Sequence, residues 1–253
     1  AIQDAIDYVN NLGGGIVYIP KGIYKITASL LLKQYVSIQG AGEQVTILLN
    51  NTTAECIKWL GTQENIPLYI KLINFTIQGG NANNEIGIRI RNGSAVKIEM
   101  VEITNQKDGI WLAQGNHIVI ELSNIHDNIG KGLIIGGDPS SIGVIFADGI
   151  NIMNNNFGRN AYHIEDNGST STGSRVISGN AFYSYAPTVN AIWLSGTGGV
   201  VIEGNWFELD TTATGITLSN KNISDVVNGT PFGTVIKGNI FASKGNIFIN
   251  IIV

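Results

Sequence analysis

Apolar and polar residues alternate along most of this chain, and similar stretches of alternation return at regular intervals. In seven places an aromatic or isoleucine residue follows an isoleucine by five positions within such a stretch. These residues are Phe75, Ile103, Ile125, Phe157, Phe182, Phe207 and Phe241. A repeat of roughly 25 residues is typical of a solenoid, because one unit cannot bury its apolar face alone and stacked units share a core. The pattern predicts an all-β fold, a single-stranded, right-handed parallel β-helix.

A short helix precedes the predicted strands. Apolar residues recur at helical spacing over residues 1–12, and three glycines end the pattern. We expect this helix to cap a single β-helix domain, 1–253, whose coils occupy 13–253. The apolar strand pattern at 247–253 has nothing after it in this sequence. We therefore expect a fragment of a longer chain, or a partner that covers this end.

Asparagine recurs two positions before four of the seven repeat residues, at Asn155, Asn180, Asn205 and Asn239. Strands in adjacent coils lie about 4.8 Å apart, so amides at equivalent positions can bond one another along the stack. A buried amide without a partner costs roughly 1–3 kcal/mol. We therefore assign these asparagines to structure.

Charge and cysteine content narrow the classes of partner. The chain has 15 Lys and Arg against 19 Asp and Glu, and its basic residues form no cluster. A nucleic acid or an anionic membrane is not an expected partner, because both need a basic surface. No apolar run is long enough to span a membrane. The single cysteine, Cys56, excludes an internal disulfide and a cysteine-based metal site.

Three segments near the N-terminus resemble the start of a known superfamily. They are AIQDAID at 1–7, GGGIVYIPKGIY at 13–24 and VSIQGAG at 36–42. They are similar to the opening of pectate-lyase-superfamily β-helix proteins, which include pectate and pectin lyases, polygalacturonases, alginate epimerases and viral tailspikes. The resemblance implies the scaffold more than an activity, because one fold can carry several chemistries.

The polygalacturonase motifs of that superfamily are mostly absent. Asp108-Gly109-Ile110 resembles the segment that holds a polygalacturonase catalytic Asp. The next coil has Gly130-Lys131-Gly132 where that family has paired aspartates. This departure weakens a polygalacturonase assignment, and Asp108 stays a candidate substrate-binding residue.

A polysaccharide-binding face is predicted from one strand of each coil. Aligning strands of the type Gly109–Leu112 places six side chains in one outward column: Arg89, Trp111, Ile134, His163, Trp193 and Thr217. A second column, two residues further along, contains Arg91 and Glu165. Indole rings offer flat platforms to sugars, and arginine fixes hydroxyls or carboxylates. The candidate substrate-binding residues are Arg89, Arg91, Trp111, Trp193 and Asp108.

The densest polar cluster holds the candidate catalytic residues His163, Glu165 and Asp166, with Asp138 one coil earlier. Register predicts backbones of Glu165 and Asp138 about 8 Å apart, within reach of the two-carboxylate geometry of glycoside hydrolysis. A polysaccharide lyase is the other reaction, in which His163, an Arg or Tyr162 removes a proton and Arg or Ca²⁺ neutralises the substrate carboxylate. No other cofactor is expected. His117 and His126 fall in predicted turns and rank lower.

Two functions from different classes fit the sequence. The first is an extracellular protein, either secreted, on the cell surface or on a virion, that binds a polysaccharide and cleaves it. The second is a non-catalytic structural or adhesion module of a viral spike or surface fibre, which can form a homotrimer. The outward column supports the first, and the missing family motifs support the second.

Overall fold

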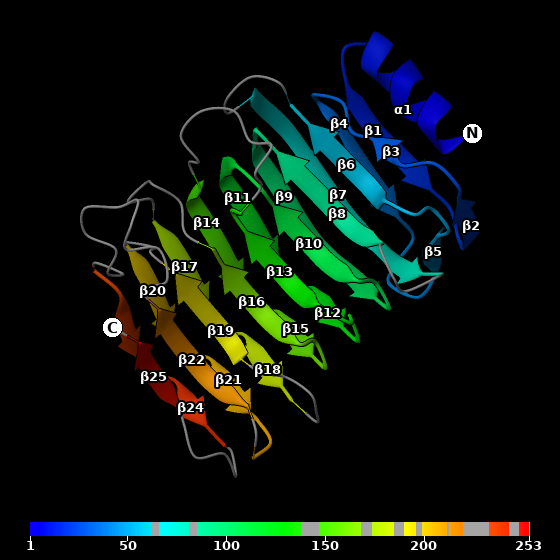
Figure 1. Ribbon diagram of the computed structural model, residues 1–253. Helices are drawn as coiled ribbons and strands as arrows, with labels where there is room; N and C mark the ends of the chain where they lie inside the picture. The colour runs from blue at the N-terminus through cyan, green and yellow to red at the C-terminus, as the bar shows by residue number, and fades with distance from the viewer. Residues whose placement is uncertain are drawn as a thin grey trace.

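The protein is a stack of short parallel strands, with the N-terminus at one end and the C-terminus at the other (Figure 1). The computed structural model describes residues 1–61, 66–80, 85–137, 147–167, 174–184, 190–195, 199–211, 213–219, 233–242 and 248–252. Each coil pairs in parallel with the next coil along the axis. The fold is the predicted right-handed parallel β-helix.

The helix α1 (Ile2–Asn11) covers the N-terminal end of the stack (Figure 1). Ile6 is fully buried against the first coil, and Ile2, Ala5 and Val9 pack around it. The helix therefore shields the core of the first coil from water, which confirms the predicted cap. In the described part of the chain, no helix is long and apolar enough to cross a membrane.

One strand of each coil joins a nine-stranded sheet, called here the β10 sheet. In spatial order its strands are β3 (Leu30–Leu31), β6 (Glu55–Leu60), β8 (Ile86–Arg91), β10 (Asp108–Leu112), β13 (Lys131–Ile135), β16 (Tyr162–Asp166), β19 (Asn190–Ser195), β22 (Thr214–Ser219) and β25 (Ile249–Ile252).

The other strands form a sixteen-stranded sheet. It starts with β1 (Gly15–Ile19), β2 (Gly22–Ile26), β4 (Val36–Gly40), β5 (Thr46–Asn50) and the long strands β7 (Ile66–Gly79) and β9 (Gly93–Thr104). Beyond β9 it divides in two. The β11 row contains β11 (Gly115–Glu121), β14 (Ala147–Met153), β17 (Arg175–Ser178), β20 (Val200–Glu203) and β23 (Val235–Lys237). The β12 row contains β12 (Asn124–His126), β15 (Asn156–Gly158), β18 (Ala181–Tyr183), β21 (Trp206–Glu208) and β24 (Ile240–Phe241).

The repeat residues stack along the inside of the β12 row. Neighbouring rings of Phe157, Phe182, Phe207 and Phe241 lie 5.3, 4.8 and 4.6 Å apart between centroids. The prediction was wrong at Phe75, because Ile77 is the register partner of Ile103 and Phe75 pairs with Val101. A shift of two residues keeps the same face of a strand inward. Because β7 is long and unbroken, the alternation in the sequence does not reveal this displacement of two residues.

The asparagine ladder is confirmed at the corner between the β11 and β12 rows. The Nδ2 group of Asn155 donates to Oδ1 of Asn180 at 3.1 Å, and the contact repeats from Asn180 to Asn205 and from Asn205 to Asn239. Each Nδ2 group also donates to a backbone carbonyl one coil earlier. These amides are satisfied by the protein itself and serve the fold.

Candidate functional site

Strand register in the β10 sheet defines a single outward column. It comprises Lys58, Arg89, Trp111, Ile134, Glu165, Trp193 and Thr217. Arg89, Trp111 and Trp193 lie where the sequence predicted them. Glu165, and not His163, occupies the position between Ile134 and Trp193. The structure therefore brings a carboxylate into the column in place of the predicted imidazole.

His163 points into the core, which contradicts its prediction as an outward catalytic residue. It is fully buried, and its ring lies 5.8 Å from Phe182 and 6.3 Å from Phe157 between centroids. Burial lowers the pKa of His163 to about 3, although the backbone of Tyr183 acts in the opposite direction. Its equivalents in the neighbouring coils are Gly132 and Ala191. Two successive residues, His163 and Ile164, are fully buried, so the alternation of inward and outward residues is interrupted here.

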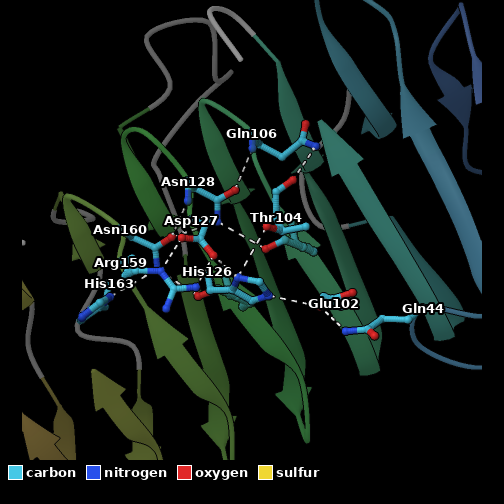
Figure 2. Close-up of polar contacts among 12 residues, drawn as sticks. Gln44, Glu102, Thr104, Gln106, His126, Asp127, Asn128, Arg159, Asn160 and His163 are labelled. Atoms are coloured by element: carbon cyan, nitrogen blue, oxygen red, sulfur yellow. Dashed lines mark hydrogen bonds and ion pairs between the residues drawn. The ribbon is translucent and has the colours of Figure 1, made fainter. Parts of the chain in front are cut away.

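The imidazole of His163 ends a second row of buried amides (Figure 2). Gln106 donates its backbone N–H to Asn128, and Asn128 donates to Asn160. Asn160 Nδ2 then lies 3.2 Å from His163 Nδ1. A neutral ring can accept this hydrogen bond through an unprotonated Nδ1. The residue thus has a structural role.

Asp166 is also buried, which contradicts its predicted place in an exposed catalytic cluster. Its carboxylate forms an ion pair with Arg175, with Oδ2 and Nε 2.6 Å apart, and both side chains are at most 1% exposed. The pair joins the end of β16 to the start of β17 inside the core. Asp138, the other predicted carboxylate, lies outside the described residues.

Glu165 is the one carboxylate of the outward column. Its Oε2 lies 3.1 Å from Nζ of Lys131, and its side chain is 13% exposed. Trp193 is its register partner in the next coil, and the Trp193 indole meets the Tyr162 ring edge-on at 5.9 Å between centroids. The Glu165 carboxylate lies beside an ammonium group and next to an indole on the outward column, so Glu165 is placed to accept a proton or to stabilise positive charge.

The other end of the column is built around Arg89. Its guanidinium lies 4.4 Å above the Trp111 ring and 2.9 Å from Glu55 Oε1. Lys58 also approaches Glu55, at 3.4 Å. Burial acts to raise the pKa of Glu55, but the hydrogen bond from Arg89 and the nearby cations lower it overall. Because Arg89 covers one face of Trp111, this indole presents less ring surface than a free platform would.

The remaining predicted binding residues lie beside the column. Arg91 follows Arg89 by two residues and pairs in register with Leu60. Asp108 is 8% exposed and accepts the backbone N–H of Lys131 at 2.8 Å. Asp108 therefore helps hold β10 to β13, and its carboxylate is mostly withdrawn from solvent.

A second polar cluster lies outside the β12 row (Figure 2). His126 bridges two carboxylates, with Nε2 3.1 Å from Glu102 Oε1 and Nδ1 2.6 Å from Asp127 Oδ2. Arg159 donates to both oxygens of Asp127. Gln44 donates to Glu102 at 3.1 Å. The network links side chains from successive coils along the helix axis.

The charges of this network are mutually compensated. The hydrogen bonds from Arg159 lower the pKa of Asp127 to about 2, against the effect of partial burial. Burial acts to raise the pKa of Glu102, but hydrogen bonds from hydroxyl, amide and imidazole neighbours lower it overall. Burial and the charge of Glu102 together raise the pKa of Glu43 nearby. The Arg159 guanidinium thus faces an ionised carboxylate, that of Asp127.

An open pocket of about 290 Å³ adjoins the network, lined by Asn124, His126, Asn156, Phe157, Gly158, Arg159 and Tyr183. The prediction that His117 and His126 lie in turns was wrong, since they belong to β11 and β12. A strand of three residues is too short to show alternation. The position of His126 on a strand follows instead from its register with Thr104 and Gly158 on the neighbouring strands.

No group of three or more His, Cys, Asp or Glu side chains is arranged to hold a metal ion in the residues that the structure describes. Cys56 is fully buried, and burial strongly raises the pKa of its thiol. It is therefore a core residue with a protonated thiol.

Known structures share this fold. PfbA, a surface adhesin of Streptococcus pneumoniae, has a TM-score of 0.77 at 20% identity, and the match covers 98% of this chain and 70% of that protein. An alginate lyase from Paenibacillus sp. has a TM-score of 0.65 at 16% identity, with 100% and 96% covered.

The catalytic unit of an α-1,3-glucanase from Streptomyces thermodiastaticus has a TM-score of 0.69 at 20% identity. That match covers 94% of this chain but only 42% of the glucanase unit. No curated protein sequence matches the chain. At these identities the structural likeness shows the fold alone. Residues 1–190, however, match the family described as "Rhamnogalacturonase A/epimerase, pectate lyase-like". The match covers most of the chain, and the chain belongs to this pectate-lyase-like family.

Proposed function

We propose that this protein is a carbohydrate-active β-helix that binds a polysaccharide along the outward column and cleaves it next to Glu165. Its family, and structural neighbours that include an α-1,3-glucanase and an alginate lyase, support a polysaccharide as the partner. Polysaccharides of this kind occur outside the cell, so we also propose an extracellular location.

The observation that carries the proposal is the adjacency of Glu165 and Trp193. Register places them on neighbouring strands, about 4.8 Å apart. Trp111 lies two strands before Glu165 on the same column, so the two indoles are about 14 Å apart along the axis. That span suits about three sugar rings. One ring lies on Trp193 while the bond beside it faces the carboxylate.

Two reactions are open to such a carboxylate. In hydrolysis, Glu165 takes a proton from the attacking water, and a second acid protonates the leaving oxygen. We retain Asp138 as the candidate for this acid. In elimination, a base removes the proton next to a uronate carboxylate and the glycosidic bond breaks to leave an unsaturated end. Three cations, Lys58, Arg89 and Lys131, pair with only two carboxylates, Glu55 and Glu165, and this excess of positive charge favours an acidic sugar. A lyase can also use Ca²⁺ for this purpose.

Product analysis separates these reactions. The protein is incubated with neutral and uronate polysaccharides, with and without calcium, and followed by new reducing ends and by ultraviolet absorbance of unsaturated ends. Hydrolysis gives the first signal alone, and elimination gives both. Glu165→Gln should lower the rate by at least a hundredfold and leave binding intact, whereas Trp193→Ala should weaken binding.

The matched control is Glu203→Gln, which removes a similar ion-paired carboxylate, 2.9 Å from Lys237, on the β11 row. Equal rates for the wild-type protein and Glu165→Gln would contradict the proposed role of Glu165. Retained binding without any product would leave the adhesion function in its place. Light scattering would then test whether that adhesion module is a homotrimer.

A further inference from the structure

The face of the β12 row differs chemically from the outward column. Two side-by-side columns of outward positions run along it. The first holds Asn124, Asn156, Ala181 and Trp206, and the second holds His126, Gly158, Tyr183 and Glu208. The open pocket lies where the first members of both columns meet. We infer that this face binds a second saccharide, a neutral sugar unit, at a site separate from Glu165.

The asparagines of this face are available to a ligand. Asn124 and Asn156 are register partners on neighbouring strands, and both line the pocket. Within the described residues, neither side-chain amide forms a hydrogen bond, whereas Asn155 bonds along the buried ladder. An amide offers one acceptor and two donors, which matches the hydroxyl pairs of a sugar ring.

Trp206 supplies the apolar platform. It is 40% exposed, and it is the one exposed tryptophan among the four of the chain. Its register partner on the pocket side is Ala181, whose methyl group leaves space above the sheet. Trp206 and Asn156 are two strand spacings apart, a distance of about 10 Å along the stack. A sugar on the indole and a second in the pocket fit this distance.

Gly158 keeps the pocket open. It occupies the outward position between His126 and Tyr183, where any side chain would project into the space. A Cβ atom at Gly158 would meet only His126 Cβ at 3.7 Å and the Tyr183 carbonyl at 4.0 Å, which are ordinary contacts. The fold therefore tolerates a side chain there, and the pocket would be filled by it.

The charges around the pocket indicate a neutral ligand. Arg159 lines it and is held by the carboxylate of Asp127, and the His126 ring, which also lines it, contacts the same carboxylate. Glu102 engages the other nitrogen of His126. A uronate or phosphate group would have to compete with these carboxylates and would be repelled by them. Hydroxyl groups face no such competition.

The experiment uses the full chain with Glu165→Gln, so that cleavage cannot consume the probe. Binding of xylohexaose, cellohexaose, maltohexaose and hexagalacturonate is measured by calorimetry. We expect at least one neutral hexasaccharide to bind, and Gly158→Val or Trp206→Ala to weaken it roughly tenfold or more. Trp193→Ala in the outward column should leave this affinity unchanged. Tyr18→Ala is the control, because Tyr18 is 57% exposed on β1, far from the pocket.

The outcomes separate this site from the proposed function. Loss of the neutral ligand in Gly158→Val, with cleavage still abolished only by Glu165→Gln, supports two sites. Absence of binding by every neutral hexasaccharide overturns the second site and leaves the cleavage proposal untouched. Binding that is lost in Trp193→Ala but kept in Gly158→Val, or a pocket that takes only hexagalacturonate, also overturns it. Asn156→Ala, at an exposed position, repeats the test without filling the pocket.

Discussion

Strand β16 and its neighbour β19 occupy equivalent places in successive coils, but their side chains differ. β19 contributes Ile192, Trp193 and Leu194, while β16 contributes Ile164, Glu165 and Asp166 at the same register. Glu165 faces outward with Lys131, whereas Asp166 is buried with Arg175. The comparison shows that adjacent carboxylates on one strand can have unrelated roles. One lies at the candidate site, and the other belongs to the core.

The buried ion pair offers the largest test of this difference. Replacing Arg175 by Met breaks the buried ion pair with Asp166, and we expect a loss of about 3–5 kcal/mol in the free energy of unfolding. The double variant Asp166→Leu with Arg175→Met should recover most of this loss. Leu and Met resemble the register partners Leu194 and Ile150.

Urea denaturation of the two variants measures this coupling. If Arg175→Met proves as stable as the wild-type protein, the ion pair of Asp166 does not stabilise the core. The contrast between a structural Asp166 and a functional Glu165 is then contradicted. A double variant that is less stable than Arg175→Met would instead indicate a specific need for the charges.

The loss of stability at acid pH provides the next test, and it concerns His163 on the inward side of β16. The pKa of His163 is about 3 in the folded protein, below its value near 6.5 in an unfolded chain. Below pH 6.5 the unfolded state therefore binds the proton first, and stability falls as the pH drops toward 3. We expect a loss of about 2 kcal/mol between pH 6.5 and pH 5 from this group. Above pH 6.5 it contributes no pH dependence.

His163→Gln is the matched variant, because a glutamine oxygen can still accept from Asn160 but does not titrate. The difference in unfolding free energy between the two proteins should shrink or reverse as the pH falls from 6.5 to 5. The lowered pKa of Asp127, about 2, acts only below this range. Parallel curves for the two proteins would place His163 in contact with solvent.

Two asparagines, Asn180 inside the coil and Asn156 on its surface, sharpen the contrast between inside and outside. Asn180→Ala removes one member of the buried ladder and takes away the acceptor of the Asn155 backbone N–H and of its Nδ2 group, so we expect a loss of about 1–3 kcal/mol. Asn156→Ala changes an exposed amide and should alter stability by less than about 0.5 kcal/mol. Thermal unfolding of the two variants compares these effects directly. Similar losses of stability would mean that exposure does not distinguish ladder asparagines from surface asparagines.

Glu165→Gln should have only a small effect on stability, under about 1 kcal/mol, because a partly exposed ion pair contributes little. The same substitution should abolish cleavage. Activity lost at constant stability is the signature of a site residue, and a large loss of stability would instead group Glu165 with Asp166.

Much of the fold could be predicted from the sequence, because its signals are local or strictly repeated. The spacing of Phe157, Phe182 and Phe207 indicated the coils, and the asparagines before them indicated the ladder. The N-terminal glycines marked the end of the cap helix. The sequence also predicts that Trp111 and Trp193 share one column, and the strand register confirms it.

Only the tertiary structure decided the register within each coil. Alternation has a period of two, so a shift of two residues leaves the pattern unchanged, as at Phe75. Two successive inward residues, such as His163 and Ile164, have no signature in alternation at all. The burial of Asp166 depends on Arg175, which arrives from the next strand across the core. Whether a polar residue serves the core or the surface is therefore set by partners that the coil brings together, and these are not adjacent in the sequence.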